Sequence, residues 1–181
     1  MTRVNVNRLM YSLLIVAAFV AAPRLPNSAL WSVLGGSITL IGLALWVTLP
    51  LHRARSLLRQ RKYDEAATEL AAVETSLTET KWKRTLASMA VGLYTSNALA
   101  AARNTLGAVR LEQNRLDDAE IHFKASLQHD AGYAVPWGNL AVLAAMRGDA
   151  GGAEEARQKA AALGFKPKLL AAVIKDKLAA K

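Results

Sequence analysis

The sequence predicts an all-α protein, in which an N-terminal transmembrane helical hairpin precedes about two to three stacked helix pairs and a C-terminal capping helix. The chain of 181 residues contains only 11 glycines and 5 prolines, a composition that favours helix. No acidic residue occurs before His52, and all 14 acidic residues follow it. We therefore place the hairpin at residues 1–52 and a separate helical domain at residues 53–181.

The second apolar segment, residues 29–51, carries no charge and predicts a transmembrane helix. A helix rises about 1.5 Å per residue, so about 20 residues cross a hydrocarbon core of about 30 Å. Trp31 and Trp46 lie near the two ends of this segment. Indole side chains prefer the membrane–water interface, and we expect both tryptophans to anchor the helix there.

The first apolar segment, residues 9–22, is short and has three interpretations. It is a secretory signal, a short transmembrane span, or a re-entrant or interfacial helix. Pro23 follows the small residues where a signal would be cleaved, which argues against the first interpretation. We favour the short span, with Arg8 and Arg24 reaching the headgroups on opposite sides.

Basic residues predict the orientation of the hairpin. A cluster directly follows the second segment and consists of Arg53, Arg55, Arg59, Arg61 and Lys62. Such clusters stay on the cytoplasmic side of a membrane. Only Arg24 lies between the two apolar segments. The predicted location is therefore the bacterial inner (cytoplasmic) membrane, with the helical domain facing the cytoplasm.

An internal period of 34 residues relates residues 103–130 to residues 137–164. The matched pairs include Leu106 and Leu140, Ala119 and Ala153, and Asn114 and Gly148. Leucine and alanine suit the contact between crossing helices, whereas asparagine and glycine tolerate the positive φ that ends a helix. Each copy therefore predicts a helix, a sharp turn and a second helix.

The pattern resembles the tetratricopeptide repeat (TPR) family, whose repeats have the same period. The residues that match the family motif are Leu106, Gly107, Ala119 and Phe123 in one copy and Trp137, Leu140, Ala141 and Ala153 in the next. Arg110, Ala144 and Arg157 depart from it, because the motif has aromatic residues at these positions. The resemblance implies a TPR-like α-solenoid with repeats at residues 100–133 and 134–166.

Other segments complete the predicted stack. Tyr63-Asp64-Glu65-Ala66 echoes Leu116-Asp117-Asp118-Ala119, which indicates a degenerate repeat at about residues 53–80. These copies lie 19 residues further apart than one period, so an inserted helix is expected at about residues 81–99. That helix either packs on the stack or lies on the membrane surface as a basic amphipathic helix. Residues 167–181 predict the capping helix.

The sequence carries no motif for catalysis or for a cofactor. It contains no cysteine, no glycine-rich phosphate loop, and no metalloprotease or serine-hydrolase motif. His122 and His129 are about two helical turns apart, too far to hold one metal ion comfortably. The lysine-rich C-terminal segment lacks stacking aromatics. We therefore expect no enzyme activity, cofactor, metal, small-molecule substrate or nucleic acid.

The resemblance implies that the first helix of each pair lines a concave face that binds a segment of a partner protein. The expected lining residues are Ala101, Asn104, Ala108, Leu111, Glu112, Val135, Gly138, Val142, Ala145 and Met146. We expect an apolar groove, unless the inserted helix or the tail helix fills it. The expected function is a membrane-anchored interaction scaffold or assembly adaptor. The alternative is a structural accessory subunit of a larger membrane complex.

Overall fold

A computed structural model describes residues 26–91, 95 and 97–179. The predicted helix at residues 9–22, with Arg8 and Arg24, lies outside this part of the chain. The described residues form eight helices and no strand, which confirms the all-α class. The helices are α2 (Asn27–Arg59), α3 (Tyr63–Glu79), α4 (Lys81–Val91), α5 (Ala98–Glu112), α6 (Leu116–His129), α7 (Ala134–Arg147), α8 (Ala150–Ala162) and α9 (Pro167–Ala179).

Helix α2 is longer than the predicted helix at residues 29–51 and runs without a break through the predicted domain boundary at residue 52. The change from uncharged to basic residues near position 52 marks where α2 begins to pack on the helical domain, and the helix does not end there. Leu51, Ala54 and Leu57 keep a helical spacing across the boundary, and all three are buried against the helical domain. The C-terminal part of α2 therefore belongs to the helical domain.

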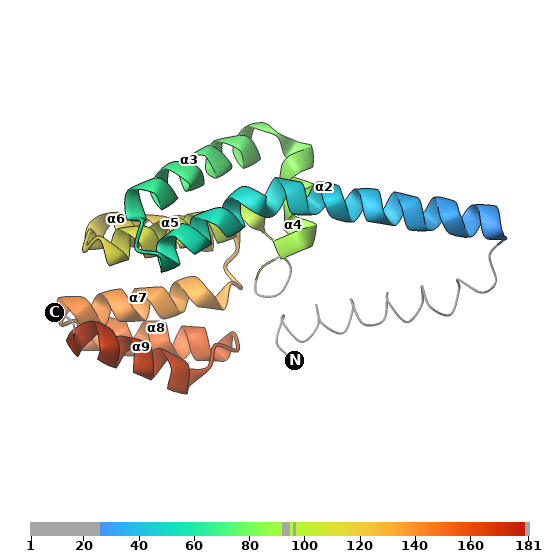
Figure 1. The fold of residues 1–181 in the computed structure, drawn as a ribbon. Coiled ribbons are helices and arrows are strands. Elements are labelled where there is room, and N and C mark those ends of the chain that lie inside the picture. The colour runs from blue at the N-terminus through green and yellow to red at the C-terminus, as the bar shows by residue number, and fades with distance from the viewer. Residues whose placement is uncertain (1–25, 92–94, 96, 180–181) are drawn as a thin grey trace.

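The N-terminal part of α2 projects beyond the other helices as a long rod (Figure 1). Within the described residues, the stretch Trp31–Arg59 is the one helix long and apolar enough to cross a membrane, with a mean hydropathy of 1.8. Its most apolar part is almost entirely uncovered by the rest of the chain. Such a surface is costly in water, because burial of apolar surface is the main driving force of folding.

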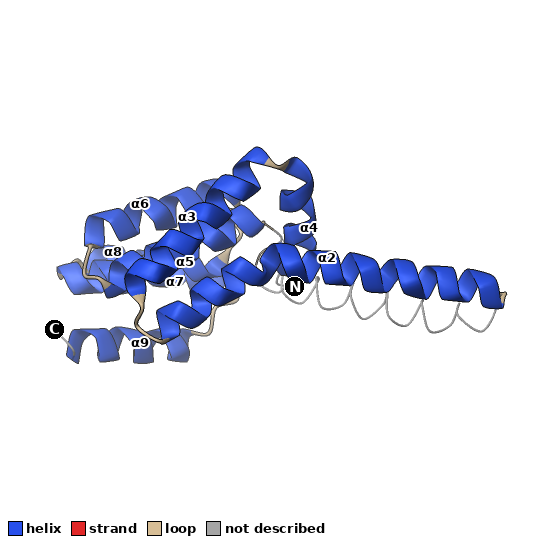
Figure 2. Ribbon diagram, turned by 45° about the horizontal axis from the view of Figure 1, so that its top comes forward, coloured by secondary structure: helices blue, strands red, loops and turns tan. Residues whose placement is uncertain are grey.

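Behind this rod the helices pack in consecutive pairs. The end of α2 packs on α3, α5 on α6, and α7 on α8, while α9 packs on α7 and α8 (Figures 1 and 2). Helix α4 lies within the segment expected as an inserted helix at about residues 81–99, but it ends at Val91, and it contacts α2, α3 and α5. Helix α9 begins at Pro167, where the sequence predicts the start of the last helix.

Three turns between paired helices have the same backbone geometry. Their central residues are Arg61, Asn114 and Gly148, with φ angles of 61°, 58° and 80°. In each turn the next backbone N–H donates to a carbonyl five residues earlier: Lys62 to Leu57 at 3.0 Å, Arg115 to Arg110 at 2.9 Å, and Asp149 to Ala144 at 2.9 Å. The expectation of positive φ at Asn114 and Gly148 is confirmed. The same turn at Arg61 lies within residues 53–80, the segment expected to hold a degenerate copy.

Helices α5 and α6 approach closely because Gly107 has no side chain. A Cβ atom at this position would lie 2.6 Å from two ring carbons of Phe123 and 3.2 Å from the carbonyl oxygen of Ala119. Phe123 and Ala119 are both fully buried. Any larger residue at position 107 would therefore separate the two helices or displace a buried ring.

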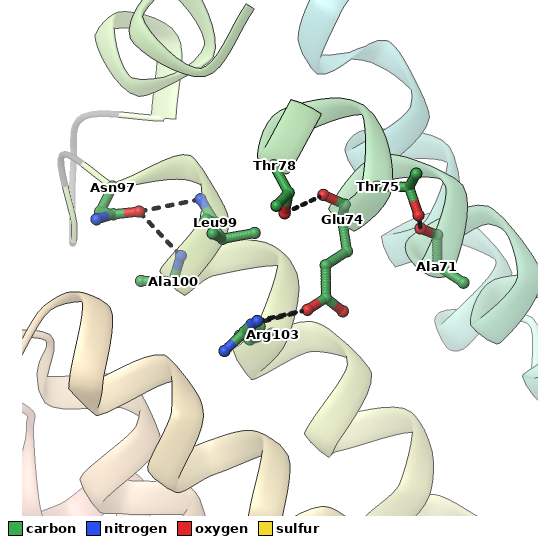
Figure 3. Close-up of polar contacts among 8 residues, drawn as sticks. All are labelled: Ala71, Glu74, Thr75, Thr78, Asn97, Leu99, Ala100 and Arg103. Atoms are coloured by element: carbon green, nitrogen blue, oxygen red, sulfur yellow. Dashed lines mark hydrogen bonds and ion pairs between the residues drawn. The ribbon is translucent and has the colours of Figure 1, made fainter. Parts of the chain in front are cut away.

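Polar contacts fix α5 against α3 and set its N-terminus (Figure 3). Arg103 Nη2 lies 2.8 Å from Glu74 Oε1, and this ion pair joins α5 to α3. The side chain of Asn97 caps α5, because its Oδ1 accepts hydrogen bonds from the backbone N–H groups of Leu99 and Ala100, both at 3.1 Å. Helix α5 is thus held at the centre of the domain.

Candidate protein-docking cleft

The structure distributes the ten predicted groove residues over different environments. Six are buried: Ala101, Asn104, Leu111, Gly138, Val142 and Met146. Three are half-buried: Ala108, Val135 and Ala145. Glu112 is exposed, and it lines one open cleft at the C-terminal ends of α5 and α7 together with the small exposed parts of Leu111 (6%) and Met146 (8%).

Helix α9 covers much of the face that the sequence leaves open on α7. A Cβ atom at Gly138 would lie 3.6 Å from the ring of Phe165, in the α8–α9 connection, and 3.8 Å from Leu170 of α9. Leu170 is buried, and Ile174 packs on the same cluster one turn later. On the neighbouring α5, the Asn104 Oδ1 accepts a hydrogen bond from Asn139 Nδ2 at 2.9 Å, which joins α5 to α7. These residues hold the stack together.

The open cleft, which we call the docking cleft, has a volume of about 450 Å³. Its lining residues come from the ends of four helices and from two turns, and they are Arg61, Tyr63, Leu111, Glu112, Asn114, Met146 and Lys177. The buried Leu111 and Met146 form an apolar floor through their small exposed parts, whereas the other residues supply charged or hydrogen-bonding groups. The cleft is therefore mixed in character and not the apolar groove that the sequence predicts.

The left-handed turns place two polar side chains at the rim of the docking cleft. Arg61 ends the α2–α3 turn and Asn114 ends the α5–α6 turn. Asparagine tolerates a positive φ, but arginine at such a position is uncommon and costs roughly 1–2 kcal/mol. The hydrogen bonds of the turn and the packing of α2 on α3 hold Arg61 in this conformation.

One charged side chain of the docking cleft forms an ion pair within the cleft, and another does not. Lys177 Nζ lies 2.6 Å from Glu112 Oε2, so this ion pair ties the end of α9 to the end of α5. Arg61 is exposed and makes no ion pair with any residue that the structure describes. A guanidinium beside an apolar floor can bind a carboxylate through two parallel hydrogen bonds. The sequence does not point to this arrangement, because Arg61 and Lys177 lie in different segments.

The pKa shifts of titratable groups on α6, away from the docking cleft, follow from ion pairs and burial. Hydrogen bonds from Lys124 and then from Arg147 lower the pKa of Glu120 below its ordinary value. The guanidinium of Arg147 reaches from α7 to Glu120 and Asp117, which joins α6 to α7. Burial lowers the pKa of His122 below its ordinary value. It also lowers the pKa of His129, which lies on the same helix.

Four of the residues predicted to mark the membrane interface, Trp31, Trp46, Arg53 and Arg55, lie along α2. Trp31 and Trp46 are both exposed, at 71% and 59%. Arg53 and Arg55 follow where α2 enters the helical domain, and Arg53 Nε lies 3.3 Å from Glu69 Oε1 of α3. Comparisons with protein-family models and with curated proteins find no match for this chain.

Proposed function

We propose that this chain is a membrane-anchored, TPR-like protein-interaction scaffold or assembly adaptor. The apolar segments form a transmembrane hairpin in the bacterial inner membrane, and the helical domain faces the cytoplasm. The docking cleft binds a short segment of a partner protein and so brings that protein to the membrane. The observation that carries the proposal is the cleft at the ends of α5 and α7, where an apolar floor lies beside an arginine without an ion pair.

The membrane part of the proposal is supported by α2. Exposed apolar side chains continue along this helix from Trp31 to Leu49, and no other part of the described chain covers them. The basic cluster around Arg53 and Arg55 follows directly, which favours a cytoplasmic helical domain.

The TPR-like part is supported by the repeated turns and by the close contact at Gly107. Three helix pairs share one turn geometry, and their Ala66, Ala119 and Ala153 occupy matching places after it. Stacked helix pairs of this kind form surfaces that bind extended segments of other proteins.

The chemistry of the docking cleft defines the partner segment. Leu111 and Met146 suit an apolar side chain, and methionine adapts its shape to the side chain that it meets. Arg61 suits a carboxylate, and Asn114 and Tyr63 add hydrogen-bonding groups at the rim. The partner segment therefore combines an apolar residue with an acidic residue or a C-terminal carboxylate.

A peptide library tests this prediction with the full chain reconstituted in lipid nanodiscs. The wild type should enrich peptides with an apolar residue beside an acidic one. Arg61→Glu should lower their affinity by about 10-fold to 100-fold, since a hydrogen bond to a charged group contributes about 1.5–3 kcal/mol. Arg59→Glu is the matched control, because Arg59 is also exposed but does not line the cleft. Equal enrichment by the wild type and Arg61→Glu would contradict the assignment.

The apolar floor has its own test. Leu111→Glu or Met146→Glu places a carboxylate among the apolar lining, so peptide capture should be lost while membrane insertion is retained. Circular dichroism of each variant checks that the helices remain folded. Unchanged capture by a folded variant would refute the role of the floor.

The orientation can be measured directly, because the chain contains no cysteine. We expect a membrane-impermeant maleimide to label Asn27→Cys in intact cells, and to label Gln60→Cys only after the cells are opened. The opposite pattern would place the helical domain outside. Purification in mild detergent then separates the two functions: a fixed stoichiometric complex would favour an accessory subunit over an adaptor.

A further inference from the structure

The junction between α2 and the helical domain lies at a defined depth if α2 spans the membrane, as proposed above. The 18 residue steps from Trp31 to Leu49 extend about 27 Å at about 1.5 Å each. This length is close to the hydrocarbon thickness of about 30 Å. Thr48 and Leu51 are buried against the helical domain. The junction therefore falls where hydrocarbon meets the lipid headgroups.

A second open cleft, which we call the junctional cleft, lies at this junction. It has a volume of about 280 Å³ and is formed by α2, α3 and α4. Its walls are mainly apolar and include Val47 and Pro50 from α2 and Ala72 and Leu77 from α3. This surface continues the exposed apolar side chains of α2, among them Leu45 and Leu49.

Lys83 of α4 is the cation of the junctional cleft. Its Nζ donates a hydrogen bond to Ser76 Oγ at 3.2 Å and lies 6.0 Å and 5.9 Å from the ring centroids of Trp46 and Trp82. Lys83 makes no ion pair with a described carboxylate. Among the described residues that line this cleft, Glu69 is the only acidic one, and its carboxylate is already paired with Arg53.

Helix α4 adds positive charge around the same place. Lys81 and Arg84 flank Lys83 in the first turn, and α4 contains no acidic residue. Cations in a first turn oppose the helix macrodipole, so the arrangement weakens α4 as an isolated helix. A bound anion beside Lys81, Lys83 and Arg84 would offset this unfavourable interaction between the cations and the helix macrodipole. Trp46 and Trp82 are both exposed, and indole rings at this depth match the headgroup layer.

We propose that the junctional cleft binds one anionic phospholipid from the surrounding membrane, with its phosphate at Lys83 and part of one acyl chain along the apolar wall. The apolar wall continues the surface of α2 and matches an acyl chain. Lys83 is a cation without a counterion and matches the phosphate, and the two flanking indoles match the interfacial layer between them. A soluble protein segment would have to reach this depth through the headgroups, whereas a membrane lipid is already there.

Native mass spectrometry of the full chain in detergent tests the proposal by titration with phosphatidylglycerol or phosphatidylcholine that carry the same acyl chains. The wild type should bind one phosphatidylglycerol in preference to phosphatidylcholine. Lys83→Gln should lower the affinity for phosphatidylglycerol about fivefold, as expected for one basic residue near a membrane surface. The affinity for phosphatidylcholine should fall less, because its choline already offsets the charge of its phosphate. Lys168→Gln, an exposed lysine of α9, is the charge-matched control and should have no effect.

A second variant tests the acyl-chain site without changing any charge. Ala72 is exposed and lines the junctional cleft, so Ala72→Phe should fill the cleft and lower the occupancy of both lipids. Equal binding of the two lipids by the wild type, an equal effect of Lys168→Gln and Lys83→Gln, or unchanged occupancy in Ala72→Phe would each overturn the proposal.

The outcome can be separated from failure of the proposed function. Release of the wild-type protein from membranes by alkaline carbonate would contradict the proposal that the chain is anchored in the membrane. If the protein stays in membranes but shows no preference for anionic lipid, only the proposed lipid site would be contradicted. Peptide capture at the docking cleft should be the same in Lys83→Gln and the wild type.

Discussion

Replacement of Gly107 by alanine should destabilise the helical domain, although the same change normally stabilises a helix. Alanine is favoured over glycine inside a helix by roughly 0.5–1 kcal/mol. At position 107, however, the new Cβ would lie 2.6 Å from ring carbons of Phe123. The ring is fully buried and cannot move into solvent. Overpacking of this kind costs about 1–3 kcal/mol, so we expect a net loss of stability.

Urea unfolding of the full chain in detergent, followed by circular dichroism, measures this effect as a lower midpoint without a change of slope. Gly151→Ala is the matched control, because the nearest atom to its new Cβ is 3.7 Å away. This control should keep or raise the midpoint. In Gly107→Ala/Phe123→Leu the smaller side chain makes room, so the double variant should lose less than the two single variants together. A Gly107→Ala variant as stable as the wild type would refute the close α5–α6 contact and weaken the TPR-like proposal.

Three further predictions concern the turns, the capping helix and the pH dependence. Gly148→Ala should lower the free energy of unfolding by about 1–2 kcal/mol in the same urea assay, because its φ of 80° disfavours a Cβ; no loss would exclude strain at this turn. Leu170→Ala should cost about 2–5 kcal/mol of local stability and speed hydrogen exchange throughout α9, whereas exposed Leu169→Ala should change little; equal exchange in both variants would argue against the packing of α9 on α7. Burial lowers the pKa of His122 in the folded state, so the unfolded state binds more protons below about pH 6.5, and the stability from this residue is lost as the pH falls through that value. His122→Gln should therefore reduce the slope of stability against pH between about pH 7 and 5, and an unchanged slope would contradict this assignment.

Local features of the sequence predicted the elements well. Asn114 and Gly148 ended helices where the period of 34 placed them, because the positive φ of such a turn is a property of single residues. Pro167 began α9 for the same kind of reason. The excess spacing between Ala66 and Ala119 predicted a further helix at about residues 81–99, and α4 occupies the first part of this segment, Lys81–Val91.

The clefts were harder to predict, because their residues are far apart in the sequence. The docking cleft joins Arg61 from the α2–α3 turn, Leu111 from α5, Met146 from α7, and Lys177 from α9. No local pattern connects these positions. The predicted apolar groove also assumed an open face on α7, which Leu170 and Phe165 cover in the folded chain.

By itself, the sequence determined the helical class, the long apolar helix and the repeated turns. Each depends on the spacing of side chains within a few helical turns. Only the tertiary structure decided that α2 continues into the helical domain, that α9 covers Gly138, and that Lys83 meets Trp46 beside an apolar cleft. These contacts depend on which helix faces pack together, and many arrangements share the same local pattern. The charge and shape of both clefts therefore became visible only in the folded chain.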